Sequence, residues 1–165
     1  MLDIILKLLK KWKVVKSVHY KNVIISESVE KFLDSYSSQF LPKETGGILL
    51  GFEDDKKIYI THATDAGIDA KHSNFRFTRD QKHCKNELDR VFIETNGRCD
   101  YIGEWHSHPF NCSISPLDMI SLLSLKLNPS NNVNNPILLI NIKEGNHWRK
   151  DIFIFEKLRL YKMSI

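Results

Sequence analysis

Two histidines and one aspartate have the clearest capacity for chemistry in this 165-residue sequence. His106 and His108 are separated by one residue, and Asp118 follows ten positions after the second histidine. Residues i and i+2 of a strand point to the same side, so a strand end would present both imidazoles together. Imidazole nitrogens and a carboxylate oxygen are ordinary zinc ligands, and catalytic zinc keeps three protein ligands plus water. The pattern predicts a zinc site if the loop after His108 folds Asp118 back.

The same stretch also has a purely structural interpretation. An HxH pair can occur by chance, and Ser115, Pro116 and Asp118 have the residue types of an N-cap, an N1 residue and an acidic N3 residue at a helix start. The two interpretations are compatible, because a helix start is a rigid place from which to hold a ligand. The ligand role of Asp118 therefore needs support from elsewhere in the chain.

Three neighbours of the histidines receive roles from strand alternation. Glu104 is aligned with His106 and His108, so it could support the metal ligands without being one of them. Trp105 and Ser107 should face the opposite side of the strand, where a packing role is expected.

Length and composition predict one domain in a reducing compartment. A chain of 165 residues can bury a core without disulfides, and its 42% hydrophobic and 27% charged content is ordinary. The three cysteines form no CxxC pair, and no signal peptide is recognisable, which favours the cytoplasm. Cys84 should be a core residue. No apolar run is long enough to span a membrane.

The net charge of +4 comes from the N-terminal end. Residues 1–16 contain five lysines and one aspartate, and the rest of the chain is balanced. A nucleic-acid-binding domain would carry a basic face, so no nucleic-acid partner is expected. We divide the chain into a basic amphipathic segment, 1–20, and one domain, 21–165. Residues 1–16 should form a helix that packs on its own domain, contacts a membrane surface or enters a partner's groove.

The order of the expected elements indicates an α+β fold with a mixed sheet. Strands are expected at 23–25, 45–52, 56–61, 74–78, 100–106, 137–142 and 151–161, with a hairpin turn at 53–55. Helices are expected from Ser26 to Pro42, at 80–95 with Cys84, Leu88, Val91 and Phe92 on one face, and at 115–127.

Two motifs in this order resemble those of the JAMM metalloproteases, also called the JAB or MPN domain. Residues 106–109 (His-Ser-His-Pro) and 115–118 (Ser-Pro-Leu-Asp) match the HxHP…SxxD signature. Residues 44–51 (Glu-Thr-Gly-Gly-Ile-Leu-Leu-Gly) match E-x-G-G-x-L-x-G at every fixed position. The resemblance spans about 23–142 and is strongest to stand-alone prokaryotic JAB peptidases. It implies a cytidine-deaminase-like mixed sheet flanked by helices in an α/β/α arrangement.

The resemblance also implies a role for each matching residue. His106, His108 and Asp118 would bind one catalytic zinc ion, Glu44 would be the general base, and Ser115 would stabilise the oxyanion. The loop 109–117 between the second histidine and the aspartate has nine residues, one fewer than the family pattern. We expect this loop to absorb the difference.

The implied function is hydrolysis of an amide or isopeptide bond on a tagged protein. Relatives remove ubiquitin-like proteins and accompany E1- and E2-like conjugation enzymes. In some antiphage operons a JAB protein reverses conjugation of a cGAS-like nucleotidyltransferase through its C-terminus. Trimming of a sulfur-carrier tail is an alternative within the class. An inert MPN-type scaffold and a RadC-like DNA-associated protein are alternatives outside it; the balanced charge argues against the second.

Overall fold

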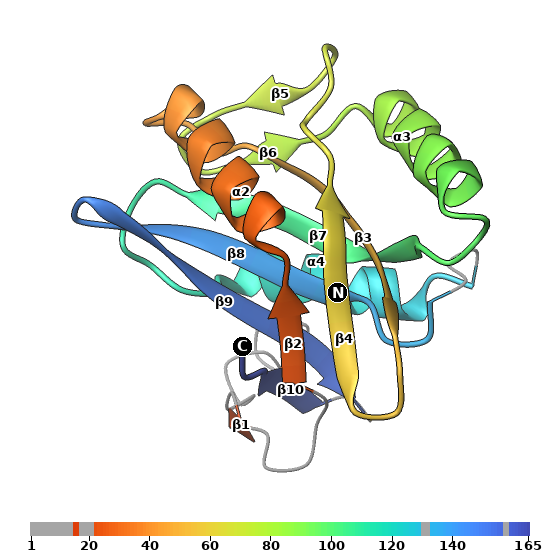
Figure 1. Cartoon of the computed structure of the whole chain (residues 1–165). Coiled ribbons are helices and arrows are strands. Elements are labelled where there is room, and N and C mark those ends of the chain that lie inside the picture. Colours follow the sequence, from red (N-terminus) through yellow and green to blue (C-terminus); the bar gives the residue numbers. More distant parts are fainter. Residues whose placement is uncertain (1–14, 17–21, 130–132, 157–158) are drawn as a thin grey trace.

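The computed structural model describes residues 15–16, 22–129, 133–156 and 159–165 (Figure 1). The helix expected over 1–16 lies outside these residues except for Val15–Lys16, which form a strand instead. No helix within the described ranges is long and apolar enough to cross a membrane. The elements are β1 (Val15–Lys16), β2 (Asn22–Ile25), α2 (Glu27–Phe40), β3 (Gly46–Glu53), β4 (Lys57–Ala63), β5 (Lys71–His72), β6 (Phe77–Thr78), α3 (Gln81–Glu94), β7 (Asp100–His108), α4 (Pro116–Leu127), β8 (Ile137–Glu144), β9 (His147–Glu156) and β10 (Arg159–Lys162).

A mixed sheet of eight strands forms the centre of the described structure. Its order is β1-β10-β9-β8-β7-β3-β4-β2, so β7 lies between β3 and β8. The β7–β8, β2–β4 and β1–β10 pairs are parallel, and the other pairs are antiparallel. The strands β5 and β6 form a separate hairpin. The strand with both histidines is therefore paired along both edges, which makes it a rigid support.

Helix α2 covers one face of this sheet. Ser26 caps it by accepting a hydrogen bond from the Val29 amide, and Val29 and Leu33 point to the sheet. They pack in one core cluster with Leu49 and Trp105. The expected helix between Ser26 and Pro42 is confirmed.

Helices α3 and α4 cover the opposite face. Ile48 and Leu50, which alternate with Leu49 along β3, pack with Cys84 of α3. Leu122 of α4 packs with alternate residues of β8 and β9 in another cluster. Figure 1 shows α2 in front of the sheet and α4 behind it. The α+β class and the α/β/α layering are thus confirmed, and Cys84 is a core residue as expected.

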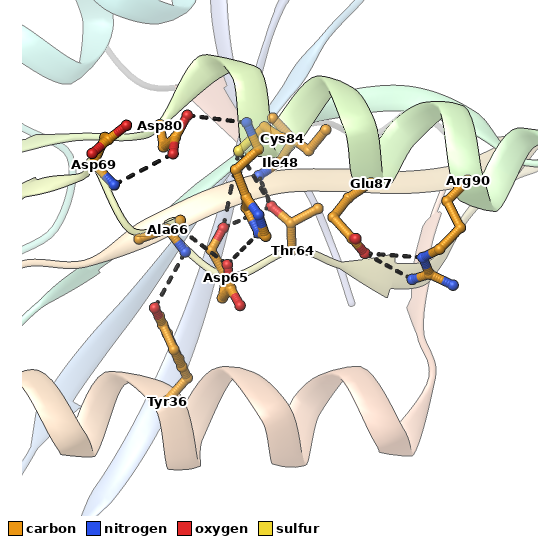
Figure 2. Close-up of polar contacts among 12 residues, drawn as sticks. Tyr36, Ile48, Thr64, Asp65, Ala66, Asp69, Asp80, Cys84, Glu87 and Arg90 are labelled. Atoms are coloured by element: carbon orange, nitrogen blue, oxygen red, sulfur yellow. Dashed lines mark hydrogen bonds and ion pairs between the residues drawn. The ribbon is translucent and has the colours of Figure 1, made fainter.

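Residues 64–66, directly after β4, join α2 and α3 to the sheet (Figure 2). Thr64 Oγ1 accepts from the Ile48 amide at 3.1 Å, and Cys84 Sγ lies 3.5 Å from the same oxygen. The Ala66 amide donates to the Tyr36 hydroxyl of α2 at 3.3 Å. These contacts fix the beginning of β3, which starts two residues after Glu44.

Three expectations about elements are wrong. The strand expected at 74–78 is limited to Phe77–Thr78, because residues 73–76 form the turn of the β5–β6 hairpin. The strand expected at 151–161 is two antiparallel strands, β9 and β10. Phe92 does not share the buried face of α3 and is 44% exposed, whereas Val91 is buried. The turn at 53–55 and the helices α3 and α4 agree with expectation to within one residue.

Candidate metal centre

The end of β7 brings two imidazoles together, and the start of α4 adds a carboxylate. His106 Nε2 lies 3.1 Å from His108 Nε2. The oxygens of Asp118 lie 3.1 Å from His106 Nε2 and 3.5 Å from His108 Nε2. One potential ligand atom from each residue lies within 4.8 Å of the others. The predicted convergence of these three side chains is confirmed, and the loop with one residue fewer allows it.

The loop after β7 fixes the orientation of the second histidine. The ring Nδ1 of His108 is 2.9 Å from the carbonyl oxygen of Cys112. A carbonyl can only accept a hydrogen bond, so Nδ1 carries the proton and Nε2 keeps its lone pair. That lone pair is the one that a metal ion would use.

The capping box of α4 fixes the carboxylate. Ser115 Oγ accepts from the Asp118 amide at 3.2 Å, and Asp118 Oδ2 accepts from the Ser115 amide at 2.7 Å. The helix start predicted from the sequence is therefore present. The same capping box also places Asp118 against the histidines, so the structural role of Asp118 is compatible with a ligand role.

Glu44 reaches this centre through the pairing of β3 with β7. Thr45, the next residue, accepts a hydrogen bond from the Ser107 amide at 2.7 Å and donates its own amide to Ser107 Oγ at 3.0 Å. Gly46 is then paired directly with His106. A residue 62 positions upstream is thus held beside the two histidines by main-chain hydrogen bonds.

The glycine pair after Glu44 allows this close approach. A Cβ atom on Gly46 would lie 2.2 Å from the Trp105 carbonyl oxygen and 2.9 Å from the His106 Cα. One on Gly47 would lie 2.3 Å from the Thr64 carbonyl oxygen. Both contacts are with backbone atoms, so no side-chain adjustment could relieve them. Two glycines are required here by the packing of β3 between its neighbours.

Burial makes Glu44 a weaker acid than an exposed glutamate. Removal from water raises its pKa to about 7, while His106 opposes the shift and the charge of Asp118 adds to it. A carboxyl with a pKa near 7 can accept and release a proton in the physiological range. The electrostatic effects of His106 and Asp118 also show that Glu44 belongs to the same local group.

The three converging side chains are strongly coupled. Burial raises the pKa of Asp118, but hydrogen bonds and charge from His106, together with Ser115, bring it down to about 2. Burial lowers the pKa of His106, but Asp118 and two nearby glutamates outweigh this effect and raise it. Burial and the charge of His106 lower the pKa of His108. At neutral pH the group therefore offers an ionised carboxylate and a neutral His108.

This donor set fits a zinc ion. Two nitrogens bound tetrahedrally at about 2.0–2.1 Å would lie roughly 3.3 Å apart, and the observed separation of the two Nε2 atoms is 3.1 Å. Two imidazoles and one carboxylate would leave the fourth coordination position of a tetrahedral zinc ion open, as in catalytic sites, whereas structural sites fill all four. The donors are therefore matched to zinc in type and in spacing.

The neighbours on β7 lie as strand alternation predicted. Trp105 packs in the α2-facing core and donates from Nε1 to the Thr64 carbonyl at 3.0 Å. Ser107 is buried and holds Thr45. Glu104 is on the side of the histidines, where its carboxylate pairs with Arg79 at 2.6 Å and contributes to the raised pKa of His106.

Sequence reasoning missed two hydrogen bonds that reach the surroundings of the centre from other strands. Ser113 donates from Oγ to Asp151 Oδ2 of β9 at 2.9 Å. His72 of β5 contacts the main-chain carbonyl of Glu44 at 2.9 Å. Neither contact follows from a local pattern. A single acid at the start of the apolar run 152–155 is the only signal that could have drawn attention to Asp151.

Known proteins share both the sequence pattern and the architecture. The sequence matches the family described as prokaryotic homologs of the JAB domain over residues 27–113, which is more than half of the chain and includes Glu44, His106 and His108. A relative named probable metalloprotease y4qB, from Sinorhizobium fredii, is 29% identical over 143 residues, which are 84% of this chain and 87% of that protein.

Two further relatives are named CD-NTase/cGAS isopeptidase. The protein from Escherichia coli is 32% identical over 89 residues, and that from Vibrio cholerae is 25% identical over 87 residues. Each alignment covers 53% of this chain, and the chain spans only 57% and 56% of the lengths of these two relatives.

The fold has a solved counterpart. Protein DSY2949 from Desulfitobacterium hafniense, known from a solution structure, superposes with a TM-score of 0.66 and 18% sequence identity, over 87% of this chain and 90% of that one. The extent of the family match and the shared architecture lead to one conclusion: the chain belongs to the prokaryotic family of JAB-domain proteins.

Proposed function

We propose that this protein is a zinc-dependent isopeptidase. The observation that carries the proposal is the convergence of His106, His108 and Asp118 within 4.8 Å, beside a glutamate whose pKa is raised to about 7. Three ligands with a weakly acidic carboxylate beside them are the components of metal-assisted amide hydrolysis. The relatives named as an isopeptidase and a probable metalloprotease support the same reaction class.

His106, His108 and Asp118 would hold the zinc ion. When bound there, zinc would act as a Lewis acid that lowers the pKa of water to about 7 and polarises the scissile carbonyl. The hydrogen bond from His108 to the Cys112 carbonyl keeps one ligand in the correct tautomer, and the capping box keeps the carboxylate in place. The protein thus preorganises its ligands before any substrate arrives.

Glu44 and Ser115 would act on the substrate. In this proposal Glu44 takes a proton from the attacking water and returns it to the leaving amine, which its pKa near 7 permits in both directions. Ser115, at the first position before α4, would direct its hydroxyl to the oxyanion of the tetrahedral intermediate. Each role requires only the side chain already held at that position.

We propose a conjugated protein as the substrate. Two relatives are named CD-NTase/cGAS isopeptidase, which supports a CD-NTase or cGAS-like enzyme as the conjugated protein. We further propose that E1- and E2-like enzymes join its C-terminus to a target, and that the cleavage serves antiphage defence in the cytoplasm. The basic segment 1–20 is proposed to be separate from the catalytic domain 21–165.

The decisive experiment measures metal content and cleavage together. The probe is a cGAS-like nucleotidyltransferase joined through its C-terminal carboxyl to a lysine of a carrier protein. We expect wild-type protein to bind about one zinc and to release the nucleotidyltransferase. Glu44→Gln should keep the zinc and lose at least about 100-fold in cleavage rate, since a general base contributes 10²–10⁴-fold.

Matched controls make the experiment interpretable. Glu53→Gln changes an acid at the other end of β3, so it should cleave like wild type. Protein that folds normally but binds no zinc would refute the enzyme proposal and favour an inert scaffold. Equal cleavage by wild type and Glu44→Gln would remove Glu44 as the base but leave the zinc centre.

A further inference from the structure

The loop between the second histidine and α4 has to meet two demands at once. It must place the Cys112 carbonyl against His108, and it must return the chain so that Asp118 faces the histidines. Residues 109–114 contain no helix or strand. Something outside the loop therefore has to fix its position.

Asp151, on β9, makes that external contact. Ser113 follows Cys112 directly, and its hydroxyl donates to Asp151 Oδ2 at 2.9 Å. Ser113 is exposed, whereas Asp151 is 2% exposed and lies in a strand that is paired on both edges. An exposed residue of the loop is thus tied to a buried residue of the sheet.

The carboxylate of Asp151 divides its two oxygens between two tasks. Oδ1 binds Lys162 of β10 at 2.7 Å and also pairs with the Arg149 guanidinium. Oδ2 accepts the hydrogen bond from Ser113. Two cations hold the carboxylate in the sheet, and these pairs explain why a buried charge is tolerated there. They do not require Ser113, so the tether to the loop is an additional function of the same residue.

We propose that Asp151 is a positioning residue for the metal centre, acting through Ser113 to hold the Cys112 carbonyl against His108. The chain of contacts runs from a buried carboxylate to an exposed hydroxyl, through one peptide bond, to the ring of a ligand. Removal of residues that support a metal ligand without binding the metal themselves typically weakens metal affinity by 10–100-fold. The inference rests on the proposed zinc function but goes beyond it, because it assigns a role to a residue outside both motifs.

The first test removes the tether without disturbing the two ion pairs of Asp151. Ser113→Ala deletes the exposed hydroxyl, Ser113→Thr keeps a hydroxyl, and Ser121→Ala deletes one on an exposed position of α4. The zinc dissociation constant is measured by competition with a chelating dye, and the visible spectrum of the cobalt-substituted protein reports ligand geometry. We expect Ser113→Ala to bind zinc about 10-fold more weakly with an altered cobalt spectrum. Ser113→Thr and Ser121→Ala should match wild type.

The second test asks whether Asp151 acts through Ser113. Asp151→Ala, which removes both oxygens that Ser113 could bind, completes a double-mutant cycle on zinc affinity when it is measured alone and combined with Ser113→Ala. If the tether is the route, the double variant binds zinc no more weakly than Asp151→Ala alone. A purely structural role for Asp151 would instead give additive losses in zinc affinity, which would overturn the proposal.

The outcomes also separate this inference from the proposed function. If Ser113→Ala and Ser121→Ala have the same zinc affinity and cobalt spectrum, the positioning role is wrong even where wild type cleaves its substrate. If wild type binds zinc and responds to Ser113→Ala but cleaves no conjugate, the positioning role stands and the isopeptidase proposal fails. A wild-type protein that binds no zinc overturns both.

Discussion

His72 donates a hydrogen bond from its ring Nδ1 to the main-chain carbonyl of Glu44, at 2.9 Å. The Glu44 amide in turn donates to the Ser73 carbonyl at 2.8 Å, so the β5–β6 hairpin holds both peptide groups of Glu44. The ring of His72 is stacked on Phe40, with centroids 4.2 Å apart, and lies 5.5 Å from the ring of Phe77. A residue with no role in the motifs therefore supports the backbone of the proposed base.

This relationship predicts the effect of His72→Phe. Phenylalanine keeps a ring between the two aromatic neighbours but removes the donor. A hydrogen bond of this kind contributes about 1 kcal/mol, so kcat should fall about 5-fold. KM and zinc affinity should stay unchanged, because the backbone contact affects only Glu44. The measurement is steady-state cleavage beside His147→Phe, an exposed histidine on β9. A change in KM with constant kcat would contradict the role.

The raised pKa of Glu44 predicts a pH-dependent stability of the metal-free protein. Its pKa in the fold is about 7 rather than the ordinary 4.5, because burial disfavours the charged form. The folded state therefore binds more protons than the unfolded state between these values, and the free energy of unfolding from this group falls as pH rises from 4.5 through 7. Urea unfolding at pH 5 and pH 8 measures the change.

The matched variant for that experiment is Glu44→Gln. Glutamine has nearly the same shape and cannot ionise, so its gain in the free energy of unfolding over wild type should be small at pH 5 and larger at pH 8. Titrating groups that lie far from Glu44 contribute equally to both proteins and cancel in the difference, whereas His106, whose pKa the charge of Glu44 helps to raise, changes together with it. An advantage that is the same at both pH values would show that Glu44 is not the group responsible.

Gly46 predicts a link between strand packing and metal binding. In Gly46→Ala, the new methyl group would meet the Trp105 carbonyl oxygen and the His106 backbone. Separation of β3 from β7 should lower the free energy of unfolding by about 3 kcal/mol and weaken zinc binding. Gly145→Ala is the control: its site is open, and only the strain of φ +59° applies, about 1 kcal/mol. Similar unfolding free energies for the two variants would refute the packing argument.

Local patterns predicted the parts of the fold that local physics determines. Ser26 and Ser115 were recognisable as helix caps because capping depends on residues within one turn. His106 and His108 were recognisable as a pair because strand alternation is equally local. The position of Glu44 followed only from the resemblance to a known family, since nothing in residues 44–47 encodes which strand pairs with β3.

The remaining features depend on contacts between distant segments. The break between β9 and β10 was missed because an apolar run with β-forming residues favours a strand without showing where it turns. The pattern placed Phe92 on the buried face of α3 together with Val91. Helical periodicity alone does not separate a buried residue from its neighbour at the edge of the apolar face. His72 and Asp151 contact the site across 28 and 38 residues, so only the folded chain brings them there.

Ser115 offers the sharpest separation of structure from catalysis, because one side chain has two proposed tasks. Its oxygen caps α4, and its hydroxyl is the proposed oxyanion donor. Ser115→Ala should remove both, with about 1 kcal/mol lost from the free energy of unfolding and about 100-fold from kcat. Ser115→Gly should lose only a few tenths of a kcal/mol, since glycine is tolerated at an N-cap.

The comparison of these two variants decides which task governs activity. If the hydroxyl acts on the oxyanion, alanine and glycine should reduce kcat equally despite their different stabilities. If the cap matters only because it holds Asp118 in place, glycine should keep most of the activity and the zinc affinity should follow stability. Urea unfolding, zinc titration and kcat measured on the same three proteins distinguish these patterns, because the oxyanion role alone predicts equal losses of rate at unequal stability.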